Sequence, residues 1–164
     1  MVDHHKREAF ASLFTSRSKA EKLPIRPPYA LDAKRFLDVC PSCLDTPCVS
    51  ACEEHIIIIG EDKTPSLLFR ESGCTFCEQC AKACVHDVLS LEASSRIKAR
   101  FSIDTKTCIA WNSVVCSCCL DVCQPKAIPF FGMFRPIVEM QTCIACGLCY
   151  SVCPTNAVQY TAIN

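Results

Sequence analysis

Short apolar segments recur along the chain and alternate with polar stretches that contain turn-forming residues. Strand-like runs precede three groups of cysteines, at 66–69 (SLLF), 100–103 (RFSI) and 136–140 (PIVEM). A shorter apolar step follows each of four cysteine groups, at Ile56-Ile57, Val88-Leu89, Ile128 and Ala157-Val158. This pattern predicts a repeated unit of strand, cysteine-bearing loop, short helical turn and second strand.

The first 30 residues stand outside this pattern. Their apolar residues are spaced to form one stripe of a short helix, at Ala9, Phe10, Leu13 and Phe14. The prolines of LPIRPPYA, which follow, predict an extended path. This segment contains six Lys or Arg residues and three acidic residues. We therefore expect a basic N-terminal arm over residues 1–30, either a solvated tail or a docking arm.

The apolar runs are too short to cross a bilayer, which takes about 20 residues, because the longest are fragments such as Ile56–Ile59. The segment HKREAFASLF contains a Lys6-Arg7 pair and faintly resembles a twin-arginine signal. It lacks the apolar stretch of about 7–15 residues that such a signal needs. We expect a cytoplasmic protein without a membrane span.

Composition narrows the classes of function. The 17 Lys and Arg residues balance 17 Asp and Glu residues, which argues against a nucleic-acid binder. The chain has four glycines and neither a G-x-G-x-x-G nor a Walker pattern, so a nucleotide or flavin site has no support. It also has 17 cysteines. In a reducing cytoplasm these favour metal ligation over a disulfide framework.

The cysteines form four sets, whose first members at positions 40, 74, 108 and 143 lie 34, 34 and 35 residues apart. This spacing indicates a fourfold internal repeat. The first two sets are Cys40, Cys43, Cys48 and Cys52, and Cys74, Cys77, Cys80 and Cys84. The last two are Cys108, Cys116, Cys119 and Cys123, and Cys143, Cys146, Cys149 and Cys153.

The spacing C-x2-C-x2-C, found in the second and fourth sets, is typical of an iron–sulfur cubane. Zinc is the alternative, but zinc sites normally use two cysteine pairs joined by a longer spacer. In two-cluster ferredoxins the fourth cysteine, three residues further on, ligates the other cluster. One set therefore cannot complete its own cluster, and the sets must work in pairs.

Two pairings follow from this rule. In the first, sets one and two exchange their last cysteines, so that Cys84 completes the first cluster and Cys52 the second. Sets three and four do the same, through Cys153 and Cys123. A nested pairing of set one with four and two with three is the alternative.

The third set has an ambiguity. Cys108 lies eight residues before Cys116, and the sequence CSCC offers Cys118 as a competing ligand. The phase of the repeat points to Cys108, which leaves Cys118 as a spare cysteine that we expect to be a small buried side chain. We expect Trp111, inside the long gap, to pack over the cluster. The sequence thus predicts four [4Fe-4S] clusters, or three if the third set is incomplete.

From Leu23 to about Tyr160 the chain resembles the ferredoxin-type accessory proteins of bacterial periplasmic nitrate reductase systems, the NapF family. The resemblance rests on IRPPYALDAKRFLDVC, GCTFCEQCAKAC, CIAWNSVVCSCCLDVCQPKAI with its long gap, and CIACGLCYSVCP. This chain departs from the family in the x4 gap of its first set, CLDTPC. The fold that we expect is α+β, with two pseudo-symmetric bacterial-ferredoxin-like halves at residues 31–95 and 96–164.

The resemblance implies a non-enzymatic, soluble cytoplasmic protein with several [4Fe-4S] clusters. Its implied partner is the molybdenum-containing catalytic subunit of nitrate reductase, met transiently before export and during maturation. Two other functions stay open at this point. One is an electron-input subunit of another redox complex, and the other is a binding chaperone whose clusters are structural.

Overall fold

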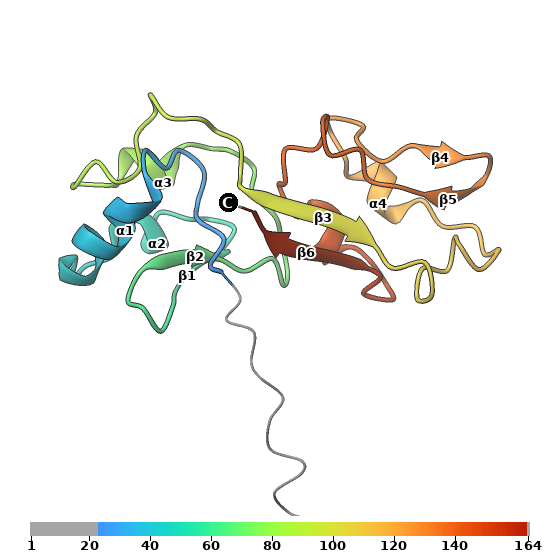
Figure 1. The fold of residues 1–164 in the computed structure, drawn as a ribbon, viewed down its shortest axis with the longest axis horizontal. Helices are drawn as coiled ribbons and strands as arrows, with labels where there is room; N and C mark the ends of the chain where they lie inside the picture. The colour runs from blue at the N-terminus through green and yellow to red at the C-terminus, as the bar shows by residue number, and fades with distance from the viewer. Residues whose placement is uncertain (1–22, 164) are drawn as a thin grey trace, which may run out of the picture.

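The computed structural model describes residues 23–163, so the helix predicted at 9–14 lies outside the described residues. The described chain forms an elongated body of short elements joined by long loops (Figure 1). Its helices are α1 (Ala33–Val39), α2 (Pro47–Ser50), α3 (Gln79–Lys82), α4 (Cys118–Asp121) and α5 (Leu148–Ser151), with one 3-10 turn at Cys40–Ser42. Its strands are β1 (Ile57–Ile59), β2 (Pro65–Leu67), β3 (Ala99–Ile103), β4 (Phe130–Phe131), β5 (Phe134–Pro136) and β6 (Val158–Ala162).

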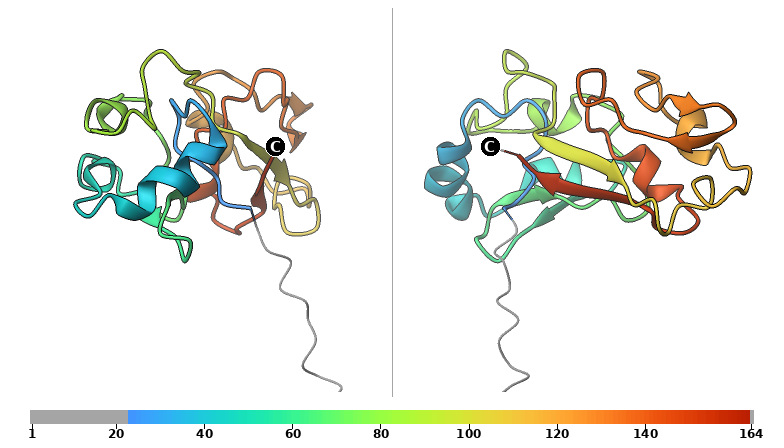
Figure 2. Two further views of the ribbon diagram at one scale, coloured as in Figure 1. Left: turned by 60° about the vertical axis from the view of Figure 1, so that its left-hand side comes forward. Right: turned by 45° about the vertical axis from the view of Figure 1, so that its right-hand side comes forward.

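The strands pair in the same order in the two parts of the chain. In the N-terminal part, β1 pairs with β2, and an isolated bridge joins Ala30 to Leu89. In the C-terminal part, β4 pairs with β5, and β3 pairs with β6 over five residues. All these pairings are antiparallel, and Figure 2 shows β3 and β6 side by side along the middle of the molecule. The strand after one cysteine set thus pairs with the strand before the next, and the two outer segments pair with each other.

The predicted strands are confirmed in part. SLLF overlaps β2, and RFSI falls within β3. PIVEM contributes only Pro136 to β5. The reason is a register shift between Phe130 and Phe131, after which Ile137 and Glu139 donate N–H groups to Pro129 and Ala127 outside a regular ladder. The helical turns expected between the last two cysteines of each set are α2, α3, α4 and α5.

One hydrophobic core runs through both parts of the chain. Phe36, Phe69 and Phe101 have no more than 2% of their surface exposed, and most of the cysteines pack against this core. The rings of Phe69, Phe101, Tyr160 and Tyr150 form a continuous cluster of tilted and edge-to-face contacts, with neighbouring centroids 4.8–5.6 Å apart. Phe69 precedes the second cysteine set and Tyr150 lies within the fourth, so the cluster joins distant parts of the sequence.

Residues 25–30 belong to the folded body, so the interpretation of residues 1–30 as a solvated tail is wrong for this stretch. Ile25 and Tyr29 are each only 6% exposed. The Leu67 N–H donates to the Ile25 carbonyl at 2.7 Å, and Tyr29 bonds through its backbone to Ser90 and Ser94 at 2.8 and 3.0 Å. The extended path predicted for LPIRPPYA is interrupted at Pro28 and Tyr29, which form a turn with Tyr29 at φ of 66°, and the segment lies against β2 and the residues after the second set.

Within residues 23–163, the structure contains no helix long and apolar enough to cross a membrane.

Candidate metal centres

The structure places all 17 cysteines around four hollows, four at each of three hollows and five at the other. We name each hollow after the first cysteine of the set that contributes three of its lining cysteines. The Cys40 site is lined by Cys40, Cys43, Cys48 and Cys84, and the Cys74 site by Cys52, Cys74, Cys77 and Cys80. The Cys108 site is lined by Cys108, Cys116, Cys119 and Cys153, with Cys118 as a fifth cysteine, and the Cys143 site by Cys123, Cys143, Cys146 and Cys149. Each hollow takes three cysteines from one set and the last cysteine of another.

This grouping follows the exchange of last cysteines between sets one and two and between sets three and four, not the nested pairing. The short helical turns produce the exchange. The last two cysteines of a set are four residues apart, and they line different hollows. For example, Cys48 lies in α2 and lines the Cys40 site, whereas Cys52 follows α2 and lines the Cys74 site. Because both hollows in a pair share two such turns, the Cys40 and Cys74 sites are neighbours, and so are the Cys108 and Cys143 sites.

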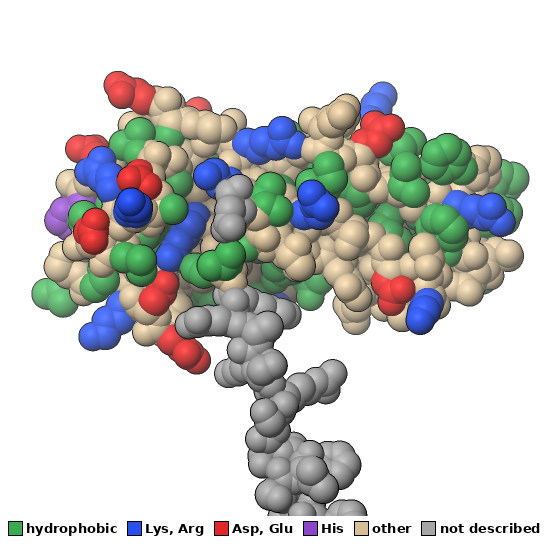
Figure 3. Space-filling model, viewed as in Figure 1, with side chains coloured by type: hydrophobic (Ala, Val, Ile, Leu, Met, Phe, Trp, Pro, Cys, Tyr) green, Lys and Arg blue, Asp and Glu red, His purple; other side chains and the backbone are tan. Residues whose placement is uncertain are grey.

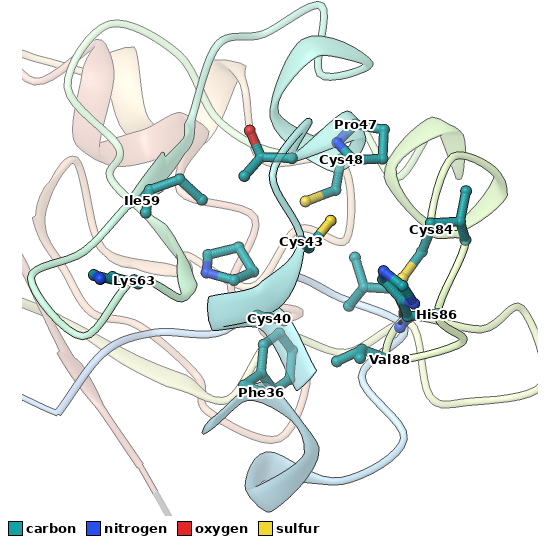
Figure 4. A pocket seen from close by; sticks show the side chains of 14 residues that line it. Phe36, Cys40, Cys43, Pro47, Cys48, Ile59, Lys63, Cys84, His86 and Val88 are labelled. Atoms are coloured by element: carbon teal, nitrogen blue, oxygen red, sulfur yellow. Dashed lines mark hydrogen bonds between the residues drawn. The ribbon is translucent and has the colours of Figure 1, made fainter. Parts of the chain in front are cut away.

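The Cys40 site illustrates the surroundings of the sulfur atoms. The space between its side chains is about 440 Å³, including space open to solvent, and it is lined mostly by apolar side chains, among them Phe36, Ile59 and Val88. In Figure 4, Cys43 and Cys48 lie on one side of this hollow, and Cys84 lies on the other beside His86. The corresponding space at the other three hollows is about 330–360 Å³. Four thiols in a largely apolar wall form a donor set for a metal centre.

Backbone conformation repeats with the cysteines. Three residues after the last cysteine of every set, the chain adopts a left-handed conformation, with φ of 52°, 50°, 52° and 52° at His55, Asp87, Lys126 and Asn156. Each of these residues donates its N–H to the carbonyl of that last cysteine. The turn reverses the chain behind the cysteine and directs it into the following apolar step. The four sets therefore share one local structure although their side chains differ.

The residue before the helical turn is also left-handed in three sets, at Thr46, Glu78 and Gly147. In the third set, Ser117 has φ of −122° instead. This departure coincides with the long gap between Cys108 and Cys116. The third loop thus reaches the same arrangement of cysteines by a different path.

Backbone N–H groups point at several sulfur atoms. Cys74, Cys84, Cys123, Cys143 and Cys153 each accept one such hydrogen bond, at 3.2–3.5 Å. Bonds of this kind stabilise a thiolate and, at an iron–sulfur centre, help set its reduction potential. At Cys153, burial favours the thiol, but N–H groups of Val158, Thr155 and Ala157 outweigh it and lower the pKa.

Four other thiols behave in the opposite way. Burial raises the pKa of Cys48 and Cys119 to about 11 and that of Cys80 and Cys149 to about 12, and the other thiols of the same hollow add to the rise. Four thiolates can share such a hollow at neutral pH only when metal cations neutralise them. The donor set therefore fits a thiolate-bound metal centre.

The size of the hollows bears on which centre they fit. A single zinc ion would draw four sulfurs to about 2.3 Å from one point. Across residues 23–163, no three His, Cys, Asp or Glu side chains are placed to enclose a single ion. The space between the side chains at each hollow, about 330–440 Å³ with the part open to solvent included, is larger than a single ion requires. A [4Fe-4S] cluster takes four cysteine thiolates and fits this donor set.

The third set is arranged as the repeat predicted, with one correction. Cys108 is 9% exposed and lines the same hollow as Cys116 and Cys119. Cys118 is exposed, not buried, and its sulfur lies 3.8 Å from that of Cys116 at the rim of the hollow. The expected burial was wrong because Cys118 begins the exposed side of α4. Trp111 packs beside Cys108, as expected, and donates Nε1–H to the Pro136 carbonyl at 2.9 Å.

Charged side chains are spread over the surface of the body, as the face in Figure 3 shows. At the end formed by β4 and β5, hydrophobic side chains gather on this face. Phe131 and Met133 in this hairpin are 65% and 70% exposed, and Val115 in the nearby third loop is 71% exposed. The Cys108 site thus lies at an apolar end of the molecule.

The sequence did not indicate which backbone N–H groups donate hydrogen bonds to the cysteine sulfurs. The N–H donors to sulfur are backbone atoms, which every residue but proline carries, so no side chain indicates them. Gly73 and Gly147, beside the second and fourth sets, could have indicated a close approach of other atoms to the backbone there, because the chain has only four glycines.

Cysteine-lined hollows with exchanged last cysteines, in a body of short antiparallel strands and helical turns, define an iron–sulfur protein of the ferredoxin type. The family model of the 4Fe-4S binding domain matches residues 136–159, which include the fourth set.

Longer matches cover nearly the whole chain. The ferredoxin-type protein NapF of Escherichia coli (strain K12) is 35% identical over 150 residues, which are 89% of this chain and 90% of that protein. The NapF of Haemophilus influenzae is 30% identical over 90% of this chain and 84% of its own length. The methylamine utilization ferredoxin-type protein MauM of Methylorubrum extorquens is 30% identical, over 88% and 74%. The chain belongs to the NapF family of ferredoxin-type proteins.

Proposed function

We propose that each of the four hollows holds one [4Fe-4S] cluster. The ligands are the cysteines of the four sets: Cys40, Cys43, Cys48, Cys52, Cys74, Cys77, Cys80, Cys84, Cys108, Cys116, Cys119, Cys123, Cys143, Cys146, Cys149 and Cys153. The carrying observation is that every hollow brings together three cysteines of one set and the last cysteine of its paired set, with the exposed Cys118 as an additional cysteine at the Cys108 site. The same strand pairing in both parts of the chain supports two ferredoxin-like halves, residues 31–95 and 96–164, with residues 25–30 packed against the first.

Anaerobic analysis of iron and acid-labile sulfide tests the cluster number. Four clusters require about 16 iron and 16 sulfide per chain, and this is the expected result. About 12 of each would mean that one site stays empty, which overturns the count but not the class. Tightly bound zinc with almost no iron would overturn the assignment of the sites.

The proposed role is one-electron transfer in the maturation of the catalytic subunit of periplasmic nitrate reductase. Support comes from the NapF relatives, which cover almost the full length of the chain. A bound cluster supplies reversible one-electron chemistry. The residues of the chain hold it, shield it with apolar side chains and donate N–H groups to its ligands. The protein itself is a carrier and not an enzyme, and we place it in the cytoplasm, where the partner is met before export.

Two other functions compete with this one. The similarity to MauM, a methylamine utilization protein, favours electron input to a different redox complex. A binding chaperone with purely structural clusters is the other, because metal ligation alone can stabilise a small fold. Redox potentiometry distinguishes an electron carrier from a chaperone. Clusters that reduce reversibly in the range of physiological donors support a carrier, and clusters inert across that range support the chaperone.

The expected partner surface follows from charge. An oxidised [4Fe-4S] cluster with four thiolates carries roughly −2, so four clusters bring the formally neutral chain to roughly −8. The loaded body is therefore acidic, and we expect it to meet a positively charged surface on the molybdenum-containing subunit. Complementary surface charge steers encounter more than it fixes affinity, so the contact is transient and weakened by salt.

Capture from anaerobic cytosol at low and high ionic strength tests this role. Loaded protein is expected to retain the unexported catalytic subunit at low salt and to release it at high salt. A matched variant with serine at the four cysteines of the fourth set provides the control and is expected to capture less. Equal capture by that variant would refute a cluster-dependent surface, and capture of only exported enzyme would refute a role before export.

A further inference from the structure

The second and fourth cysteine loops meet backbone to backbone. The N–H of Cys74 donates to the carbonyl of Cys146 at 2.6 Å, although the two residues belong to different halves of the chain. Cys74 lines the Cys74 site and Cys146 lines the Cys143 site. A single peptide hydrogen bond therefore separates the walls of these two sites. We call residues 73–74 and 146–148 the loop junction.

Two of the four glycines of the chain make this approach possible. A methyl group on Gly73 would lie 2.5 Å from the Leu148 nitrogen and 2.6 Å from the Cys146 oxygen, both of them backbone atoms. On Gly147, which has φ of +84°, it would lie 2.2 Å from a ring carbon of Phe69. Gly73 accepts a side chain only if the two loops move apart, and Gly147 accepts one only if the Phe69 ring moves. Both glycines are buried and adjoin a cysteine of the site on their own side.

Further contacts hold the junction in place. Phe69, which covers Gly147, lies against Phe101 and Tyr160 with centroids 5.6 and 5.2 Å away. Arg96, in the segment that connects the halves, donates to the carbonyls of Met140 and Cys143 at 2.5 and 2.9 Å. Phe69 thus holds the fourth loop against the N-terminal half, and Arg96 holds the same loop against the segment that connects the halves.

The junction determines the order of the sites. The Cys40 site adjoins the Cys74 site through α2 and α3, and the Cys143 site adjoins the Cys108 site through α4 and α5. Only the loop junction brings the Cys74 and Cys143 sites, one from each pair, into contact through a direct hydrogen bond between the described loops. The order along the molecule is therefore Cys40, Cys74, Cys143 and Cys108. In Figure 1, α1 and α2, which carry residues of the Cys40 site, lie at the opposite end of the body from α4, which carries residues of the Cys108 site.

We propose that Gly73 and Gly147 are positioning residues that fix the separation of the two inner clusters and so join two cluster pairs into one array of four. This inference rests on the proposed function, because it requires clusters in the inner sites. It adds that the halves do not act as two independent two-cluster carriers. Magnetic interaction between reduced clusters falls steeply with their separation, so it reports the spacing directly.

The test compares Gly73→Ala with Gly60→Ala in the full-length loaded protein. Neither glycine has a positive φ, but at Gly60 a methyl group would meet chiefly the flexible Asp62 side chain, at 2.9 Å. EPR spectra of the fully reduced proteins are expected to show weaker spin–spin broadening in Gly73→Ala, with Gly60→Ala matching the unsubstituted protein. Retained iron with unchanged broadening in Gly73→Ala would overturn the proposal.

Iron content keeps the test decisive if Gly73→Ala disturbs cluster binding. A shared junction predicts loss from both inner sites, about 8 of 16 iron, whereas loss of about 4 means that Gly73 serves only its own loop and overturns the proposal. Gly147→Ala, with Gly132→Ala as control, repeats the comparison at positive φ, since Gly132 has φ of +69° and no atom within 4 Å of an added methyl group. Failure of the proposed cluster assignment differs from all of these outcomes, because the unsubstituted protein would then lack iron.

Discussion

The guanidinium carbon of Arg26 lies 4.8 Å from the centre of the Phe36 ring. The same side chain donates to the Pro65 carbonyl at 2.9 Å and to the Thr64 hydroxyl, and it pairs with Asp62 at 3.2 Å. Phe36 is fully buried and lines the Cys40 site. Arg26 therefore connects the segment before the first set, the β1–β2 hairpin and the wall of a metal centre.

Replacing Arg26 with alanine is expected to destabilise the loaded protein by about 1–3 kcal/mol, because the hydrogen bonds and the cation–π contact are lost together. The midpoint of urea-induced loss of visible absorbance measures this change. Arg100→Ala, at an exposed position of β3, is the matched control and is expected to shift the midpoint little. An equal shift in both variants would contradict the connecting role of Arg26.

Replacing Cys153 with serine is expected to remove the cluster of the Cys108 site and to leave that of the Cys143 site, although Cys153 belongs to the fourth set. The iron content should fall by about 4 per chain, and cluster-resolved EPR should identify the missing centre. Cys118→Ser is the control within the same hollow, since Cys118 is exposed at its rim, and it is expected to keep all iron. Loss of iron in Cys118→Ser would reassign the ligands of the third set.

Replacing Lys126 with glycine is expected to stabilise the protein by up to about 1 kcal/mol. Lys126 has φ of 52°, a conformation that costs a residue with a side chain about 1–2 kcal/mol, and the greater freedom of glycine in the unfolded chain offsets part of the gain. A β-branched residue should have the opposite effect, so Lys126→Val serves as the comparison. The same urea midpoint measures both, and a shift in one direction for both variants would argue against a backbone effect.

Cluster assembly is expected to release protons and to tighten as the pH rises. In the cluster-free protein, burial raises the pKa of Cys48 to about 11 and of Cys149 to about 12, so these groups are thiols at neutral pH. Ligation requires thiolates, and each ligand must therefore lose its proton on binding. Reconstitution with iron and sulfide under anaerobic pH-stat control measures the release. Assembly without proton release would contradict protonated thiols in the cluster-free sites.

Cysteine spacing predicted the grouping of the cysteines, because a thiolate every three residues can surround one centre while a fourth on the next turn faces another. The structure gathers the same groups, Cys108 included, whereas their role as ligands stays a prediction. The helical turns followed from the x3 spacing. The pairing of β4 with β5 was less predictable, since a register shift after Phe130 ends the ladder before most of the apolar run at 136–140 can join it.

The sequence could not predict contacts that depend on backbone atoms far apart in the chain. The hydrogen bond from Cys74 to Cys146 joins groups that are the same in almost every residue. The path of residues 25–30 was predicted to be extended, but its burial depends on the carbonyl of Ile25 meeting the N–H of Leu67, about 40 positions later. The side chains of Arg26 and Phe69 gave no sign of their partners for the same reason.

The left-handed residue behind each cysteine set is His, Asp, Lys or Asn in turn, yet φ differs by no more than 2° among the four. Successive duplications of one ancestral segment of about 34 residues would produce such a chain, with the backbone path kept while the side chain at this position diverged. The left-handed turn is kept for a geometric reason. It returns the chain to the strand that follows the set while the last cysteine of the set still lines the hollow of the paired set. A minimal synthetic repeat could therefore carry any of these residues here, provided that it copies the turn.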